Sequence, residues 1–156
     1  MRPRAPSETI VVDANIILSA VLGFRSRPLL DIISARRALV MSLEASLEVR
    51  HVLARLDPDA PMLIEIADEV LQAIEVVEPV RYDASLASAE DALYQAVASR
   101  NGSVSDAHLL ALAWTYDADI WSHDRDFAGT GWPSWSNANL AAALRVEANP
   151  PASELS

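Results

Sequence analysis

Two carboxylates and an imidazole follow a short apolar run near the end of the chain. The stretch ADIWSHDRDFAG, residues 118–129, carries His123, Asp124 and Asp126 directly after residues typical of a buried strand. A solvated turn would explain each of these residues by itself. Acids that meet other acids from distant parts of the chain would instead form a metal site. The remaining carboxylates therefore decide between the two interpretations.

An aspartate also ends the first apolar run, TIVVD, at Asp13. In open α/β sheets, ligands bind beyond the carboxyl ends of the strands. If both runs are parallel strands of one sheet, Asp13 and Asp124 lie at the same end of that sheet. A turn would explain either acid alone. The presence of both acids at the same end of one sheet favours a ligand-binding site.

Asp106 is the second residue of the helical stretch SDAHLLALAWTYD, residues 105–117. Helical spacing puts it on the same face as Leu109, Leu110 and Ala113, which is the apolar face. The segment from Ser103 to Asp106 also fits a capping box, in which the Asp106 side chain would bind the amide of Ser103. An inward-facing ligand and a helix cap both remain open, and one residue could serve as both.

A second pair of acids lies on the amphipathic stretch LEASLEVRHVLARL. Glu48 flanks the apolar face beside Val52, whereas Glu44 points further out, toward His51 and Arg55. Because Glu44 and Glu48 stand four residues apart, they also repel each other on a helix. We expect Glu48 to enter a site and Glu44 to be a surface partner of His51 or Arg55.

Carboxylates gathered at a partly buried site resist ionising together unless a cation joins them. Mg²⁺ and Mn²⁺ prefer carboxylate oxygens and also bind phosphate oxygens, so hydrolysis of a phosphodiester is the chemistry that fits. One ion and two ions would use the same acids, and both remain open. The expected cluster contains Asp13, Glu48, Asp106, Asp124 and, as a further member, Asp126.

The three histidines are weaker candidates. His51 and His108 lie on the polar sides of their expected helices, which predicts surface positions. His123 could touch a substrate, but solvent exposure is the favoured interpretation.

The composition sets limits on partners and compartment. A net charge of −10, with all 12 basic residues arginine, argues against binding nucleic acid through a broad basic face. A nuclease stays possible, because bound cations neutralise both the acids and the phosphates. The chain has no cysteine, no signal-peptide pattern and no run able to span a bilayer. We therefore expect a cytoplasmic protein with no membrane partner.

Strand and helix patterns alternate along the chain, which predicts an α/β fold: three α/β/α layers around a mostly parallel central sheet. We expect flexible ends at residues 1–8 and 147–156, and one domain over 9–146. The expected strands are residues 9–13, 38–42, 75–79, 118–122 and 133–136. The expected helices are residues 14–23, 27–37, 43–56, 60–74, 83–99, 105–117 and 137–146.

Four stretches in order, VVDAN, LEVRHVLARL, SDAHLLALA and IWSHDRDF, resemble the motifs of PIN domains, most strongly those of VapC-type toxins. The resemblance covers the chain from Thr9 to about Leu144, and SHDRDF matches the family's Thr/Ser-x-Asp-x-Asp-Phe pattern. It implies a PIN-like fold and a set of site residues. The metal-binding acids would be Asp13, Glu48, Asp106 and Asp124, with Asp126 additional, Asn15 supporting the first acid and Ser122 supplying the hydroxyl before the fourth.

The resemblance also implies an activity and partners. The protein would be an Mg²⁺- or Mn²⁺-dependent endoribonuclease, the toxin of a type II toxin–antitoxin pair. It would form a homodimer and bind a cognate antitoxin whose tail occupies the active-site groove. The chain departs from many relatives in being more acidic, in lacking lysine, and in having NGSVS where some carry extra acids.

Two other functions compete with this one. A phosphatase of the haloacid-dehalogenase type also uses an aspartate after a strand, but it needs a second aspartate where this chain has Asn15, and usually a lysine. A non-catalytic PIN-like module would bind RNA or a protein without metal. Its folding and partner binding would survive acid-to-amide substitutions.

Overall fold

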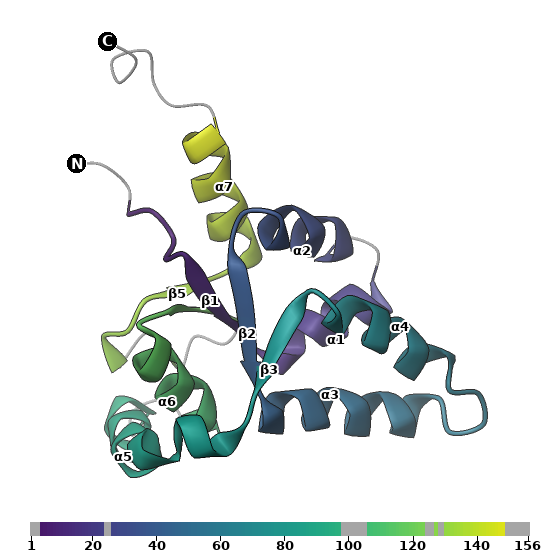
Figure 1. The fold of residues 1–156 in the computed structure, drawn as a ribbon, viewed down its shortest axis with the longest axis horizontal. Coiled ribbons are helices and arrows are strands. Elements are labelled where there is room, and N and C mark those ends of the chain that lie inside the picture. Colours follow the sequence, from purple (N-terminus) through teal and green to yellow (C-terminus); the bar gives the residue numbers. More distant parts are fainter. Residues whose placement is uncertain (1–3, 24–25, 98–105, 124–126, 128–129, 149–156) are drawn as a thin grey trace.

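The computed structural model describes residues 4–23, 26–97, 106–123, 127 and 130–148. Five strands form one sheet in the order β3-β2-β1-β4-β5, and every pair of neighbours is parallel. The predicted fold class is therefore confirmed (Figure 1). The strands are β1 (Thr9–Val12), β2 (Ala38–Ser42), β3 (Ile74–Val77), β4 (Asp119–Trp121) and β5 (Ser134–Trp135).

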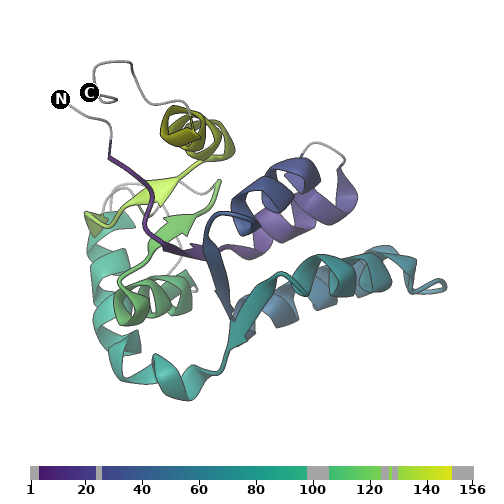
Figure 2. The ribbon, with the colours of Figure 1, turned by 45° about the horizontal axis from the view of Figure 1, so that its top comes forward.

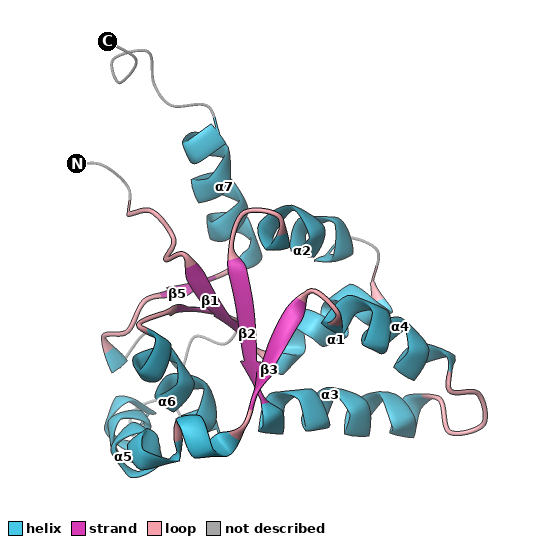
Figure 3. Ribbon diagram, in the orientation of Figure 1, coloured by secondary structure: helices cyan, strands magenta, loops and turns pink. Residues whose placement is uncertain are grey.

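Seven α-helices and two short 3-10 helices are present in the described part of the chain. In Figure 2, α5 and α6 lie on the opposite side of the strands from α1 to α4. Coloured by secondary structure, the strands form a central layer between these two groups (Figure 3). The helices are α1 (Ala14–Leu22), α2 (Ser26–Ser34), α3 (Leu43–Leu56), α4 (Met62–Leu71), α5 (Leu86–Val97), α6 (Ala107–Tyr116) and α7 (Asn137–Ala148), with η1 (Pro79–Arg81) and η2 (Asp83–Ser85).

Helix α6 is the buried helix of the fold. All its residues from Leu109 to Ala113 have no exposed surface, and it packs on β1, β2 and β4. This agrees with its sequence, which is apolar around most of the helix instead of along one stripe. Because it is held on every side, α6 is a rigid support for the residue that precedes it, Asp106.

The register of the sheet places residues at its carboxyl end. Val12 of β1 is paired with Trp121 of β4, so Asp13 and Ser122 follow at the same level. Strand β2 ends at Ser42, and its hydroxyl accepts a hydrogen bond from the Ala45 amide, which caps α3. The three central strands therefore deliver polar side chains to one end of the sheet.

The segment between β3 and α5 differs from the prediction. The expected strand 75–79 ends at Val77, because Pro79 has no amide hydrogen for the ladder and begins η1. The expected helix 83–99 begins only at Leu86, after η2. These two short turns place Tyr82 in the core, where it is 1% exposed. No helix in the described residues is long and apolar enough to cross a membrane.

Candidate metal centre

Asp13 is the acid most firmly held at the carboxyl end of the sheet. It links β1 to α1, with its amide donating to the Trp121 carbonyl (3.0 Å) and its carbonyl accepting from the Ile16 amide (3.1 Å). The side chain makes no cap to its own helix, and the residue is only 7% exposed. A carboxylate is therefore fixed by backbone bonds on both sides and kept mostly out of water.

Ser122 orients this carboxylate. Its hydroxyl donates to Asp13 Oδ2 at 2.5 Å, and its own amide donates to the Trp135 carbonyl at 3.1 Å. Ser122 is 3% exposed, so the bond is shielded from water. The motif implied a supporting hydroxyl at Ser122, just before Asp124. In the structure this hydroxyl contacts Asp13.

Glu48 lies within electrostatic range of Asp13. Burial raises the pKa of the Glu48 carboxyl above its usual value, and the negative charge of Asp13 raises it further. The side chain nevertheless remains open to solvent on α3. Two acids that are 35 residues apart in sequence therefore repel each other in the folded protein, which is the situation that a divalent cation relieves.

Asp106 directly precedes α6 and is half-buried. Its side chain makes no capping bond to α6, and its backbone (φ −91°, ψ 11°) is outside the helix. Ser103 lies outside the described residues, so the capping box stays a prediction. The next turn of α6 reaches the same end of the sheet as Asp13, because the charge of Asp13 acts on His108.

Asp124 and Asp126, the remaining expected acids, lie outside the described residues, and their places in the site stay predictions. Within the part of the chain that the structure describes, no three acids or histidines are grouped closely enough to hold a metal ion. Of the expected acids, Asp13 and Glu48 lie within electrostatic range of each other, and the membership of Asp106 in a metal-binding cluster stays a prediction.

Asn15, in the first turn of α1, was expected to support Asp13. Its side-chain oxygen is buried and has no hydrogen-bond partner within the described part of the chain. A buried amide oxygen without a partner is costly, and the support of Asp13 by Asn15 stays a prediction.

Two expectations about the neighbouring polar residues are wrong. His108 is half-buried, with Nδ1 2.7 Å from Ser42 Oγ, because the end of β2 lies against the first turn of α6. Glu44 accepts a hydrogen bond from the Tyr82 hydroxyl, and not from His51 or Arg55, because η1 and η2 carry Tyr82 over the start of α3. The expected exposure of His51 and His123 is confirmed.

Burial also shifts the pKa values of two groups in this neighbourhood. It lowers the pKa of His108, an effect that the carboxylates of Glu44 and Asp13 partly oppose. It raises the pKa of Tyr82, and the bond to Glu44 raises it further. One feature of the sequence pointed to the contact between His108 and Ser42: Ser42 is a polar residue at the end of an otherwise apolar strand.

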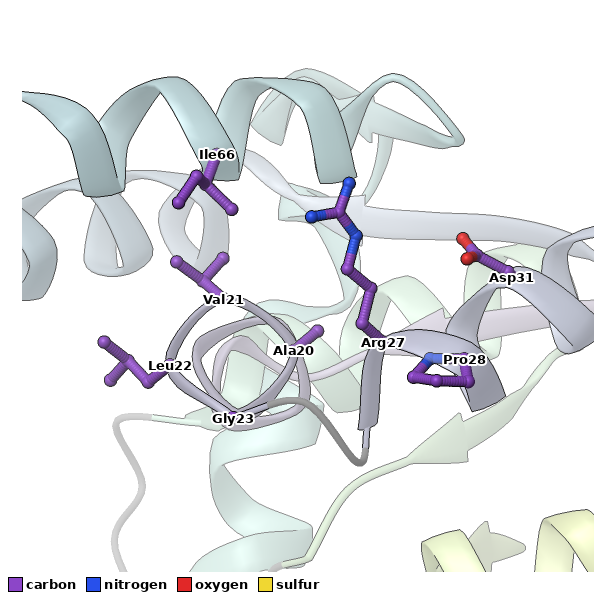
Figure 4. Close-up of a pocket in the computed structure, with 8 residues that line it drawn as sticks. All are labelled: Ala20, Val21, Leu22, Gly23, Arg27, Pro28, Asp31 and Ile66. Atoms are coloured by element: carbon purple, nitrogen blue, oxygen red, sulfur yellow. The ribbon is translucent and has the colours of Figure 1, made fainter.

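A separate pocket of about 390 Å³ lies at the other end of α1 (Figure 4). Its walls come from α1, α2 and α4, and none of the expected acids lines it. The lining residues are Ala20, Val21, Leu22, Gly23, Arg27, Pro28, Asp31 and Ile66. The whole of α1 separates this pocket from Asp13, so it is not part of the acidic site.

The same fold is found in known proteins. The model of the PIN domain family matches residues 11–145, whereas no curated protein matches the chain. A chain of the VapBC2 complex from Rickettsia felis, solved with a DNA fragment from its promoter, is similar with a TM-score of 0.63 at 12% identity. The match covers 82% of this chain and 98% of that one.

Two further structures show the same fold. A chain of FitAcB from Neisseria gonorrhoeae has a TM-score of 0.62 at 17% identity, over 84% of this chain and 99% of that one. A chain of FitAB bound to the IR36 DNA fragment has a TM-score of 0.58 at 16% identity, over 82% and 94%. At these identities the likeness establishes the fold alone.

Proposed function

The chain belongs to the PIN domain family, and we propose that it is a metal-dependent endoribonuclease, the toxin of a type II toxin–antitoxin pair. The observation that carries the proposal is the environment of Asp13. This buried carboxylate is oriented by Ser122 and raises the pKa of a second acid, Glu48. A fold under selection for stability alone gains nothing from placing two acids in mutual repulsion.

The donor set suits Mg²⁺ or Mn²⁺. It consists of carboxylate oxygens at one end of a sheet, with no cysteine in the chain and with a repulsion that a cation would relieve. Asp13, Asp106, Asp124 and Asp126 would hold the ion or ions, and Glu48 would bind a metal or orient the attacking water. Such a cation supplies a water of lowered pKa and stabilises charge at the phosphorus undergoing in-line displacement.

The residues of the chain have separate tasks in this proposal. Ser122 would hold the Asp13 carboxylate in its orientation through the hydrogen bond to Oδ2. Glu48, which is exposed to solvent, would receive or hold the water that attacks the phosphodiester. Helix α6 keeps Asp106 at the same end of the sheet.

The proposed partners rest on the family, on the resemblance to VapC-type toxins, and on the similarity to chains of VapBC2 and FitAcB. We propose a cognate antitoxin whose tail occupies the active-site groove, an RNA substrate, and a homodimer acting in the cytoplasm.

The test is cleavage of RNA in the presence of Mn²⁺ by the wild type and by Asp13→Asn. We expect cleavage by the wild type that stops with a chelator, and a loss of at least about a hundredfold in the variant. Equal cleavage by both proteins would contradict the proposal. So would cleavage by neither across varied RNAs and metals, which would favour a non-catalytic module.

A further inference from the structure

A chain of polar side chains borders the acidic site at the carboxyl end of β2. Ser42 Oγ accepts from the Ala45 amide at 3.1 Å and lies 2.7 Å from His108 Nδ1. The Ser42 hydroxyl also interacts with the Tyr82 hydroxyl, which in turn donates to Glu44. These contacts connect α6, the start of α3 and the turn between η1 and η2, and we call His108, Ser42, Tyr82 and Glu44 the polar chain.

The His108 end of the polar chain reaches the acids. His108 follows Asp106 by two residues, and the carboxylates of Asp13 and Glu44 both act on its imidazole. Glu48 lies one helical turn beyond Glu44 on α3. The imidazole therefore lies close to residues that would surround the substrate, whereas its helical spacing predicted a surface position.

The two ring nitrogens of His108 differ in their surroundings. Nδ1 is bound to Ser42, which fixes the orientation of the ring. Within the described residues no other group hydrogen-bonds to the ring, and Nε2 is not among the buried atoms that lack a partner. The ring is half-buried, so part of it reaches solvent, and no described group binds Nε2.

The carboxylates by themselves give no reason to prefer RNA. Metal-assisted hydrolysis acts on the phosphodiester, which RNA and DNA share, and the group that distinguishes them is the ribose 2′-hydroxyl. This hydroxyl both donates and accepts hydrogen bonds. It can thus bind Nε2 of an imidazole whichever of the two ring nitrogens carries the proton.

We propose that His108 binds a ribose 2′-hydroxyl through Nε2 and so gives the acidic site its preference for RNA over DNA. The inference rests on the proposed nuclease function and adds a residue that reads the sugar. Ser42 and Tyr82 are positioning residues in this account. They hold the imidazole through Nδ1 and tie it to Glu44 on α3.

The test compares cleavage of a fluorescently labelled, mixed-sequence single-stranded RNA with cleavage of the DNA of the same sequence, in Mn²⁺. The readout is the ratio of the two kcat/KM values. His108→Asn keeps a polar atom near Nδ1 but removes the distal nitrogen, and we expect the ratio to fall about tenfold, the value of one lost hydrogen bond. His51→Asn, on the exposed face of α3, is the matched control and should leave the ratio unchanged.

A second substitution guards against misfolding of the first. His108→Gln restores an amide near the position of Nε2, and its ratio should stay within about threefold of the wild type. Tyr82→Phe removes only the hydroxyl that links Ser42 to Glu44, and should lower the ratio by about threefold. Tyr116→Phe is its control, because the Tyr116 hydroxyl is buried without a partner in the described part of the protein.

Several outcomes would overturn the inference while leaving the nuclease function intact. One is a wild type that cleaves RNA and DNA equally, and another is a His108→Asn variant that slows both to the same extent or neither. Weakened Mn²⁺ binding by His108→Asn in a calorimetric titration would assign His108 to the metal instead of the sugar. A wild type that cleaves neither polymer would overturn the proposed function and this inference together.

Discussion

Two buried aspartates lie at opposite ends of neighbouring strands, and their surroundings differ. Asp119 begins β4 and is 2% exposed. Its Oδ1 receives the Arg4 guanidinium at 3.0 Å. Its Oδ2 accepts from the Ser7 amide at 3.0 Å and from the Trp135 indole at 2.8 Å. The charge of Asp119 is thus matched by an arginine and two further donors from the protein itself.

Asp13 follows β1 at the other end of the sheet and is nearly as buried, at 7% exposed. It accepts the hydroxyl of Ser122, but a second acid, Glu48, lies close enough for its pKa to rise. The amino end of the sheet therefore uses a carboxylate to tie segments together. The carboxyl end gathers carboxylates whose repulsion an external cation would relieve.

The largest effect on stability is expected at Asp119. Asp119→Ala leaves the Trp135 indole and the Ser7 amide without their acceptor, which should lower the free energy of unfolding by about 2–4 kcal/mol. Urea denaturation measures this. Arg4→Gln should cost less than about 1 kcal/mol, because the Arg4 side chain is 61% exposed. If Asp119→Ala were as stable as the wild type, Asp119 would not stabilise the fold through its bonds to Arg4, Ser7 and Trp135, and the proposed difference from Asp13 would be wrong.

The second comparison uses two glutamates one turn apart on α3. Glu48→Gln removes a charge that Asp13 repels, so in metal-free protein at pH 7 it should raise the free energy of unfolding, by less than about 1 kcal/mol because the side chain is exposed. Glu44→Gln weakens the acceptor of the Tyr82 hydroxyl and should lower the free energy of unfolding by about 1 kcal/mol.

The pH dependence of the Glu48 effect follows from the sign of its pKa shift. Because the pKa of Glu48 is raised in the folded protein, its ionised form costs stability at neutral pH, and that cost is lost as pH falls through the raised pKa. The gain from Glu48→Gln should therefore shrink in acid, near the ordinary value of 4.5. A gain that grows as pH falls would contradict the assignment.

The smallest effect is expected at a second pairing near the amino end of the sheet. Glu147 on α7 accepts from Arg37 at 2.6 Å and Arg36 at 2.8 Å, and the bond to Arg37 lowers its pKa. This stability is fully present above pH 4.5 and is lost as pH falls through the lowered pKa. Glu147→Gln should cost less than about 1 kcal/mol at pH 7, since the side chain is about one-third exposed.

Thermal melts of Glu147→Gln at pH 7 and pH 3 measure this contribution. The difference from the wild type should be present at pH 7 and smaller at pH 3, because pH 3 lies below the ordinary value of 4.5. Glu69→Gln is the control, because its pairing with Arg27 is 64% exposed on the glutamate side. An equal difference at both pH values would show that the pairing at α7 acts through packing instead of charge.

Local patterns were sufficient to predict the elements that carry the acids. The stretches 38–42 and 43–56 were predicted to the residue, because an apolar run ends at a capping serine and a regular amphipathic helix begins. The strand predicted over 9–13 ends one residue earlier, at Val12, because Asp13 is the N-cap of α1, and the predicted parallel sheet is confirmed.

Contacts that depend on packing between distant segments were not predictable. The residues of the His108–Ser42 bond are 66 positions apart, and those of the Tyr82–Glu44 bond are 38 apart. Helix and strand periodicity concerns short spacings only, so it could not predict either bond. Asp119 did carry a signal, since an acid at the start of a buried strand requires a partner, but Arg4 lies 115 residues away. Local sequence spacing determines which face of a helix or strand a residue occupies. The hydrogen-bond partner of its side chain depends on how the helices pack against the sheet.

The most direct test of the contrast is a calorimetric titration with Mn²⁺ at pH 7 of three proteins: wild type, Asp13→Asn and Asp119→Asn. The wild type should bind Mn²⁺. Asp119→Asn should also bind Mn²⁺ when the titration is run below the melting temperature of this variant. Asp13→Asn should not bind Mn²⁺. Binding by Asp13→Asn with the affinity of the wild type, or no binding by the wild type at millimolar Mn²⁺, would contradict it.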